Sequence, residues 1–196
     1  MTCRNLRARA RDSLDNSIFS GSWLFLLLAC LITSLLSSLL SGCLNIFSLI
    51  FVGCIQVGLC AFTLAIVRNS NRKNDLELLF YGFTNNLGTH MLSGLLIGIF
   101  TFLWSLLFII PGIVKAYSYS MTYYVLLDNP ELSVLDAIKE SERIMRGYKM
   151  KAFLLDLSFI GWIFVGSFLC CGIGMLWVTP YMQAAKAHLY EEIRYN

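Results

Sequence analysis

Two ionisable side chains border long apolar stretches of the sequence and are the first candidates for chemistry. Lys115 follows a window without charged residues at 78–114, and Asp156 precedes a second such window at 157–185. An ionisable group at membrane depth costs about 2.5–3.5 kcal/mol on insertion scales and usually faces a polar interior. Each also has a structural interpretation, because Lys115 can extend to the outer headgroups and Asp156 lies shortly after Lys151, near the membrane interface.

Other polar side chains could join these two around a hydrated cavity. Tyr119 and Tyr123 follow Lys115 at helical spacing, which puts all three on one face of a continuous helix. Pro180 kinks the last apolar segment and can free backbone carbonyls for a ligand. The candidate cavity residues are Lys115, Tyr119, Tyr123, Asp156, Tyr181 and Gln183. Tyrosines more often form interfacial belts or interhelical hydrogen bonds, so packing is the alternative explanation.

Catalytic, metal and cofactor signatures are missing from the sequence. It has no GxxxxGK[ST], GxSxG or HExxH motif, and its two histidines, His90 and His188, both lie near the edges of predicted spans. Gly172 and Gly174 form a GxG, but Trp177 occupies the place of the third glycine in a dinucleotide fingerprint. We therefore expect no catalytic residue, no metal and no cofactor, and a protein that is not an enzyme.

Composition assigns the chain to the membrane. Hydrophobic residues make up 57% of the sequence and charged residues 14%, against about 25% charged in a typical soluble domain. Basic residues gather in a few short segments, and the formal net charge is only +3. Nucleic-acid binders instead concentrate basic residues on one surface, so we expect no nucleic-acid partner.

Six apolar segments have the character of transmembrane helices. A spanning helix needs about 20 mostly apolar residues, and residues 16–67 alone contain no charged side chain. The predicted spans are 23–40, 46–67, 91–110, 113–127, 152–170 and 173–190. The sequence thus predicts an all-α membrane protein of one polytopic domain, residues 1–196, with the lipid bilayer as its immediate partner.

Three further segments read as amphipathic surface helices. They are an arginine-bearing segment at 3–17, an acid-started apolar stripe at 75–83, and a polar helix at 130–146. For the last helix we expect Asn129 as the cap, Pro130 as its first residue and Gly147 at its end. Arg143 and Arg146 on this helix are the candidate residues for docking a membrane-protein partner.

Pro111 and Gly112 interrupt a long apolar segment and leave two topologies open. Either the chain turns there and crosses back, or one kinked helix runs through both residues. With a turn, all but Lys115 of the fifteen lysines and arginines fall on one side of the membrane. A single kinked crossing would move the five basic residues that follow Asp128 to the outside. The positive-inside rule therefore favours six spans with both termini cytoplasmic, and places Lys115 and Asp156 near opposite faces.

The seven cysteines show no metal or redox spacing. Cys30, Cys54 and Cys60 lie in apolar runs, where cysteine acts as a small hydrophobe. Cys43 and the pair 170–171 fall in predicted outer turns, so a disulfide between these turns stays open.

Several strings in the second half of the chain are highly particular, above all Leu-Ser-Phe-Ile-Gly-Trp at 157–162. The others are LWSLL at 103–107, IPGIVK at 110–115, YSM at 119–121, DNPE at 128–131, FLL at 153–155, GIG at 172–174 and PY at 180–181. Together they resemble the bacterial integral membrane family called domain of unknown function 975. The resemblance implies a small multi-spanning protein of the bacterial cytoplasmic membrane with no assigned activity.

Two functions follow as hypotheses. The first is a non-enzymatic scaffold or accessory subunit that associates with a membrane protein or with copies of itself, because helix-packing motifs and a polar cytoplasmic helix are present. The second is a small transporter or lipid-handling protein with the polar cavity described above. An intramembrane enzyme would need a nucleophile and a base within reach of each other, and the sequence shows no such pair.

Overall fold

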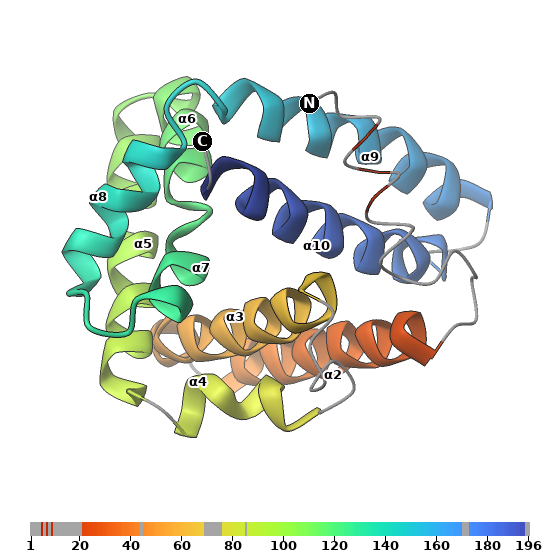
Figure 1. Ribbon diagram of the computed structural model, residues 1–196, viewed down its shortest axis with the longest axis horizontal. Coiled ribbons are helices and arrows are strands. Elements are labelled where there is room, and N and C mark those ends of the chain that lie inside the picture. Colours follow the sequence, from red (N-terminus) through yellow and green to blue (C-terminus); the bar gives the residue numbers. More distant parts are fainter. Residues whose placement is uncertain are drawn as a thin grey trace. The chain divides into compact units, whose positions relative to one another are not determined.

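The computed structural model describes residues 5, 7, 9, 21–43, 45–68, 76–84, 86–169 and 173–194 (Figure 1). In these parts of the chain every regular element is a helix. The all-α prediction is therefore confirmed. The chain divides into two compact units, which are described separately. The first unit comprises Met1–Ile32, Phe62–Leu76 and Met150–Asn196, and the second comprises Thr33–Ala61 and Glu77–Lys149.

Four long helices coincide with predicted apolar segments. They are α2 (Gly21–Cys43), α3 (Asn45–Val67), α9 (Lys149–Leu169) and α10 (Ile173–Arg194), which contains Pro180. Each has 21 to 23 residues, which corresponds to about 32–35 Å at 1.5 Å per residue. Apolar residues fill α2 and α3, while α9 and α10 also contain charged residues, among them Asp156 and Lys186.

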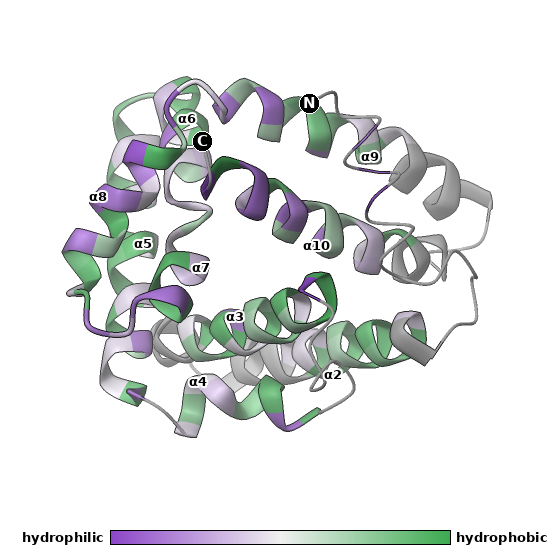
Figure 2. Cartoon of the chain, in the orientation of Figure 1, coloured by the Kyte–Doolittle hydropathy of each residue, from purple (hydrophilic) through white to green (hydrophobic). Residues whose placement is uncertain are grey.

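Within the described residues, α5 (Leu87–Leu107) is the single helix that meets both the length and the hydropathy of a membrane span. Shorter apolar stretches are found at Trp23–Leu35 in α2 and at Val52–Val67 in α3. Figure 2 shows the hydrophobic character of α5 and the more hydrophilic character of α8 (Val134–Ile144).

Glycines bring three segments of the second unit into backbone contact. A Cβ atom on Gly58 of α3 would overlap the backbone of Leu79, and one on Gly82 would overlap the backbone of Cys54. Leu79 belongs to the short 3-10 helix η1 (Leu76–Phe80) and Gly82 to α4 (Tyr81–Thr84). The helix predicted at 75–83 is therefore present as two short pieces, and they pack directly on α3.

The third close contact joins α3 to α5. A Cβ atom on Gly53 would overlap the carbonyl of His90 and would lie 2.9 Å from the backbone nitrogen of Gly94. Gly94 is the first glycine of the GxxxG step in α5. This glycine is used for packing within the chain.

The chain does turn between the third and fourth predicted spans, but the turn is at Phe108. Phe108 has extended backbone angles between α5 and α6 (Ile109–Tyr119), so the turn predicted at Pro111 and Gly112 was misplaced. Pro111 fits the first turn of α6, where backbone N–H groups have no intrahelical acceptor. Gly112 lies where a Cβ atom would collide with Ser105, so it permits close contact between α5 and α6.

The segment predicted as one span at 113–127 is two helices. α6 ends at Tyr119 and α7 runs from Thr122 to Asp128. At the junction, the backbone N–H and the hydroxyl of Ser120 both donate to the carbonyl of Tyr117, a three-residue step that replaces the α-helical pattern. The prediction of a continuous helix was wrong because this local hydrogen bonding competes with helix propagation.

The polar helix is shorter than predicted and has a different cap. α8 spans Val134–Ile144, and the hydroxyl of Ser133 accepts a hydrogen bond from the N–H of Asp136 at 3.2 Å. Ser133 therefore replaces Asn129 as the cap. Pro130 lies before the helix, in a turn closed by the Leu132 N–H and the Asn129 carbonyl. Gly147, with φ of 83°, follows the helix as expected.

Two predictions concern residues that the structure describes little or not at all. Of the helix predicted at 3–17, Asn5, Arg7 and Arg9 are described, and they are helical. Cysteines 170 and 171 lie outside the described residues, as does the side chain of Cys43.

We expect Gly58→Ala to destabilise the protein by about 1–3 kcal/mol, because the added methyl group meets the backbone of Leu79, which cannot rotate away. Thermal unfolding in detergent measures the effect. Gly161→Ala in α9 is the control, since a Cβ atom there has no neighbour within 4 Å. It should be neutral or stabilise by about 0.5–1 kcal/mol. Equal melting temperatures for the wild type and Gly58→Ala would contradict the close contact.

Candidate functional site: an ion pair between α6 and α8

Lys115 lies in the second unit and forms an ion pair with Glu142 of α8. Its Nζ is 2.6 Å from Glu142 Oε1, and the two side chains are 23% and 32% exposed. The sequence indicated that the Lys115 charge needs a polar partner, but it did not identify Glu142. Both side chains are partly shielded from water, so their mutual attraction is screened less than that of a fully exposed ion pair.

Two aromatic rings complete the surroundings of the Lys115 ammonium group. The Nζ atom lies 5.0 Å from the ring centroid of Trp104 in α5 and 5.8 Å from that of Tyr119 in α6. Both distances are within the range of cation–π attraction. One cation thus connects α5, α6 and α8.

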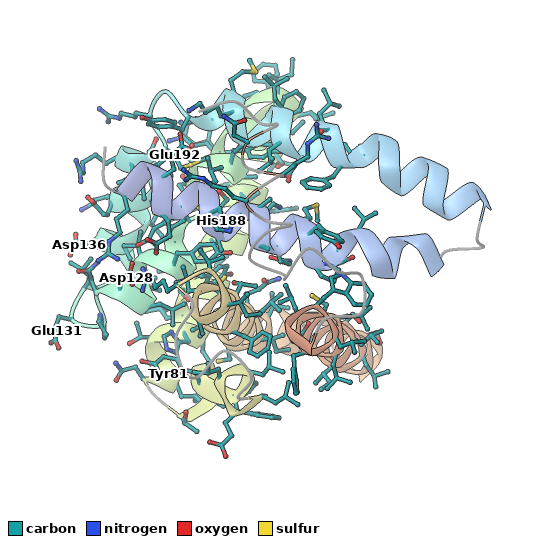
Figure 3. The ribbon with its side chains drawn as sticks, turned by 45° about the vertical axis from the view of Figure 1, so that its right-hand side comes forward. Tyr81, Asp128, Glu131, Asp136, His188 and Glu192 are labelled. Atoms are coloured by element: carbon teal, nitrogen blue, oxygen red, sulfur yellow. The ribbon has the colours of Figure 1, made fainter. Side chains whose placement is uncertain are left out.

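A buried hydrogen bond and an apolar contact hold α8 against the same helices. The hydroxyl of Ser141 donates to the carbonyl of Ser118 at 2.7 Å. Tyr119, Val134 and Ile138 form a buried cluster, against which Leu96, Ile97 and Phe100 of α5 pack. The apolar face of α8 is therefore covered, and its charged face is directed outward. Figure 3 shows Asp136 and Glu131, near the start of α8, pointing away from the helices.

The electrostatics of the pair keep Glu142 ionised at neutral pH. The hydrogen bond from Lys115 lowers the pKa of Glu142 below its usual value, while burial opposes this shift. The positive charges of Lys115, Lys149 and Arg146 also lower this pKa. Glu142 is therefore an anion among three cations.

The candidate cavity residues are divided between the two units. Lys115, Tyr119 and Tyr123 belong to the second unit, while Asp156, Tyr181 and Gln183 belong to the first. Tyr119 is buried in the α8 contact. Tyr123 is half-buried in α7, beyond the break at Ser120, so the single helical face predicted for Lys115, Tyr119 and Tyr123 does not exist.

Asp156 is paired within the first unit. Its Oδ1 lies 3.3 Å from Nζ of Lys186 in α10, and its side chain is 19% exposed. Two further ion pairs join elements of this unit: Arg68 with Glu191 at 2.6 Å and Lys151 with Glu192 at 3.2 Å. Figure 3 shows Glu192 near the end of α10. All three pairs connect α10 to another segment of the first unit.

The two candidate docking arginines differ in their surroundings. Arg143 is exposed and donates two hydrogen bonds to Glu140, at 2.7 and 2.6 Å, within α8. Arg146 is also exposed and lies just beyond the end of α8. Both side chains are therefore on the surface.

Sequence periodicity contained a signal for Glu142. The buried positions of α8 are 134, 137, 138 and 141, and residue 142 lies one turn after 138, at the edge of this stripe. Glu140, by contrast, lies on the side that pairs with Arg143. A lysine in an apolar segment together with a glutamate bordering an apolar stripe is the pattern that could have identified the pair. Lys186, one residue outside an apolar window, was a similar signal for Asp156.

A double-mutant cycle tests the Lys115–Glu142 pair. Lys115→Met and Glu142→Gln should show a coupling energy of about 0.5–3 kcal/mol in unfolding experiments, as expected for residues in direct contact. Lys139→Met with Asp136→Asn is the matched control, because that pair is exposed and its atoms are 3.5 Å apart. Its coupling should be close to zero. Equal coupling in the two cycles would refute the importance of the α6–α8 ion pair.

The pH dependence of stability gives an independent check. The pKa of Glu142 is lower in the folded protein than the value of about 4.3 for a free glutamate. The ionised carboxylate therefore stabilises the fold above about pH 4.3. This contribution is lost as the pH falls through the lowered pKa. The difference in melting temperature between the wild type and Glu142→Gln should therefore shrink below about pH 4. Glu77→Gln controls for the loss of one exposed carboxylate. A difference that stays constant down to pH 3 would contradict the linkage.

Comparison with known proteins agrees with the resemblance seen in the sequence. Residues 108–196 match the family model described as "Protein of unknown function (DUF975)". No curated protein and no solved structure matches the chain. The matched region contains Lys115 and Glu142, whereas Trp104 and the α5 residues that pack against α8 precede it. Over residues 108–196, slightly less than half of the chain, the protein is similar to the DUF975 family.

Proposed function

We propose that the protein is a multi-pass integral membrane protein that acts without catalysis, as a scaffold or accessory subunit. Exposed apolar faces support a membrane location. On α2 the exposed side chains Leu24, Leu28, Leu31 and Leu35 follow helical spacing. α9 has a similar face with Phe153, Leu154, Leu157 and Ile160. Surfaces of this kind are stable when lipid covers them.

Helix lengths and the distribution of charge support several crossings. α2, α3, α9 and α10 are each long enough to cross a hydrocarbon core of about 30 Å. Under the proposed topology both termini lie in the cytoplasm, together with α8 and its basic residues. Six crossings were predicted from the sequence, the other two at 91–110 and 113–127.

The observation that carries the scaffold role is the attachment of α8. Its apolar face is covered by α5 and α6, and the ion pair and the Ser141 hydrogen bond fix its position. The outward face presents Lys139, Arg143 and Arg146. Lys139 and Arg143 are paired with Asp136 and Glu140, so this face carries both signs of charge and is suited to docking a protein with a complementary pattern of charges. A homo-oligomer formed through the same face is the other partner that this surface could serve.

The transport or lipid-handling hypothesis has less support. It needs Lys115 to meet a ligand in a cavity, but the Lys115 charge is already matched by Glu142 and two aromatic rings. A ligand anion would have to displace a carboxylate held at 2.6 Å. We therefore favour a structural role for Lys115.

Charge reversal on α8 tests the docking proposal. Arg143→Glu with Arg146→Glu should reduce the recovery of a stoichiometric partner, or of the homo-oligomer, at least tenfold, because like charges then face each other. Native mass spectrometry after gentle extraction from the protein's own membrane reports the complex. Arg194→Glu on α10 is the control, since it changes an exposed cation of the same charge.

The amount of protein in the membrane fraction must stay the same in all variants, so that lost association is not lost insertion. Association that survives the double reversal would rule out α8 as the docking surface. A wild-type protein that is recovered as a monomer without any partner would rule out the scaffold function itself.

A further inference from the structure

Two basic side chains at the passage from α8 to α9, Arg146 and Lys149, form no ion pair in the part of the chain that the structure describes. Their basic neighbours are different, because Arg143 and Lys151 each form an ion pair with a glutamate. Arg146 is exposed, and Lys149 is half-buried. Both cations are therefore available to a further anion.

One carboxylate lies near these two cations, and it already has a closer partner. The positive charges of Arg146 and Lys149 both lower the pKa of Glu142, which places them within electrostatic reach of that carboxylate. Glu142 itself accepts a hydrogen bond from Lys115 at 2.6 Å. Three cations thus face one carboxylate, which leaves two positive charges in excess. A local excess of this kind attracts anions.

Next to the two cations, α9 exposes an apolar face, which we call the α9 stripe. Its members are 39–66% exposed and follow helical spacing: Met150, Phe153, Leu154, Leu157 and Ile160. Lys149 is the first residue of α9, so its position relative to the stripe follows from the helix itself. Phe153 lies one turn after Lys149, on the same side of the helix. A cation and an apolar surface are therefore continuous on α9.

The length of the α9 stripe corresponds to one leaflet of a bilayer. Met150 and Ile160 are ten residues apart, which is about 15 Å along the helix axis. Half of a hydrocarbon core of about 30 Å has the same length. An acyl chain whose headgroup lies at the cations would therefore extend along the whole stripe.

We propose that Arg146, Lys149 and the α9 stripe form a binding site for an anionic phospholipid. The phosphate group binds to the two cations, and an acyl chain lies along the stripe. Basic residues at the cytoplasmic end of a membrane helix attract anionic headgroups in this way. The inference rests on the membrane location proposed above, and it does not require the scaffold function.

A phospholipid fits both parts of the site with one molecule. A soluble phosphate would match the cations and leave the α9 stripe without an apolar cover. An acidic protein surface would do the same, because a charged surface does not cover exposed apolar side chains favourably. The continuity of charge and apolar surface on one helix is therefore the observation that selects a lipid.

The lipid dependence of stability tests the site in the purified protein. Phosphatidylglycerol added in a neutral detergent should raise the melting temperature, because a ligand that binds the folded state stabilises it. Phosphatidylcholine, whose headgroup carries no net charge, should bind at least tenfold more weakly. The variant Arg146→Gln with Lys149→Gln should respond equally to the two lipids. A preference for phosphatidylglycerol that survives in this variant would overturn the proposal.

Two controls distinguish a lipid site from general attraction of anions. Lys139→Gln with Arg194→Gln removes two exposed cations outside the site and should keep the preference for phosphatidylglycerol. Equal loss of the preference in both double variants would overturn the site. Glycerol phosphate, at the concentration at which the lipid acts, should leave the melting temperature unchanged. An equal rise with glycerol phosphate would show a site for a soluble anion and overturn the lipid proposal.

A second measurement leaves both cations in place. A photoreactive benzoylphenylalanine at Leu154, on the α9 stripe, is exposed to an equimolar mixture of the two lipids. Its adducts, detected by mass spectrometry, should be enriched at least threefold in phosphatidylglycerol. The same residue at Leu35, on the exposed face of α2, should form adducts in the proportion of the mixture. Equal composition at the two positions would overturn the inference.

The outcomes separate the lipid site from the proposed scaffold function. Loss of lipid selectivity in the wild type, with a partner still recovered, would overturn the lipid site alone. Selective stabilisation by phosphatidylglycerol in a protein recovered without any partner would support the lipid site and count against the scaffold function alone. A wild-type protein that is absent from the membrane fraction would overturn both proposals.

Discussion

The second unit depends on one constraint: the charge of Lys115 must be compensated where little water reaches it. Glu142 supplies the compensating charge at 2.6 Å, and Trp104 and Tyr119 supply aromatic faces. Since these partners come from α5, α6 and α8, meeting the constraint also determines where the three helices lie. The hydrogen bond from Ser141 to the Ser118 carbonyl reinforces the same contact. The need to compensate the Lys115 charge therefore determines how α5, α6 and α8 pack together.

Close backbone contact is the complementary source of order. Gly53, Gly58 and Gly82 lie where a side chain would collide with a neighbouring backbone. At these points α3 meets the backbone of η1, α4 and α5 without intervening side chains. Such contacts gain dispersion energy over many atom pairs and do not depend on water release. They explain why small residues in apolar helices help to predict which helices pack together, although their side chains have no reactive groups.

The sequence predicted the helices well and their junctions less well. Windows without charge located α2, α3, α5, α9 and α10, because helix formation over an apolar segment follows from composition alone. The turn at Phe108, the break after Tyr119 and the Ser133 cap were missed. Each depends on a few hydrogen bonds of about 1 kcal/mol that compete with similar alternatives nearby. Lys115 was recognised as unusual, whereas its partner required knowing which way α8 faces.

The backbone conformation of Phe108 indicates which residues determine the reversal of the chain between α5 and α6. Its backbone is extended, with φ of −158° and ψ of 144°, a shape that nearly every amino acid adopts. Almost any amino acid could therefore occupy the position at which the chain reverses. The requirement for small residues applies instead to Gly112 and Ser105, where α5 and α6 are in contact. The direction of the chain after the turn therefore depends on how α5 packs against α6. A substitution that alters this packing would redirect the chain more than a substitution of Phe108.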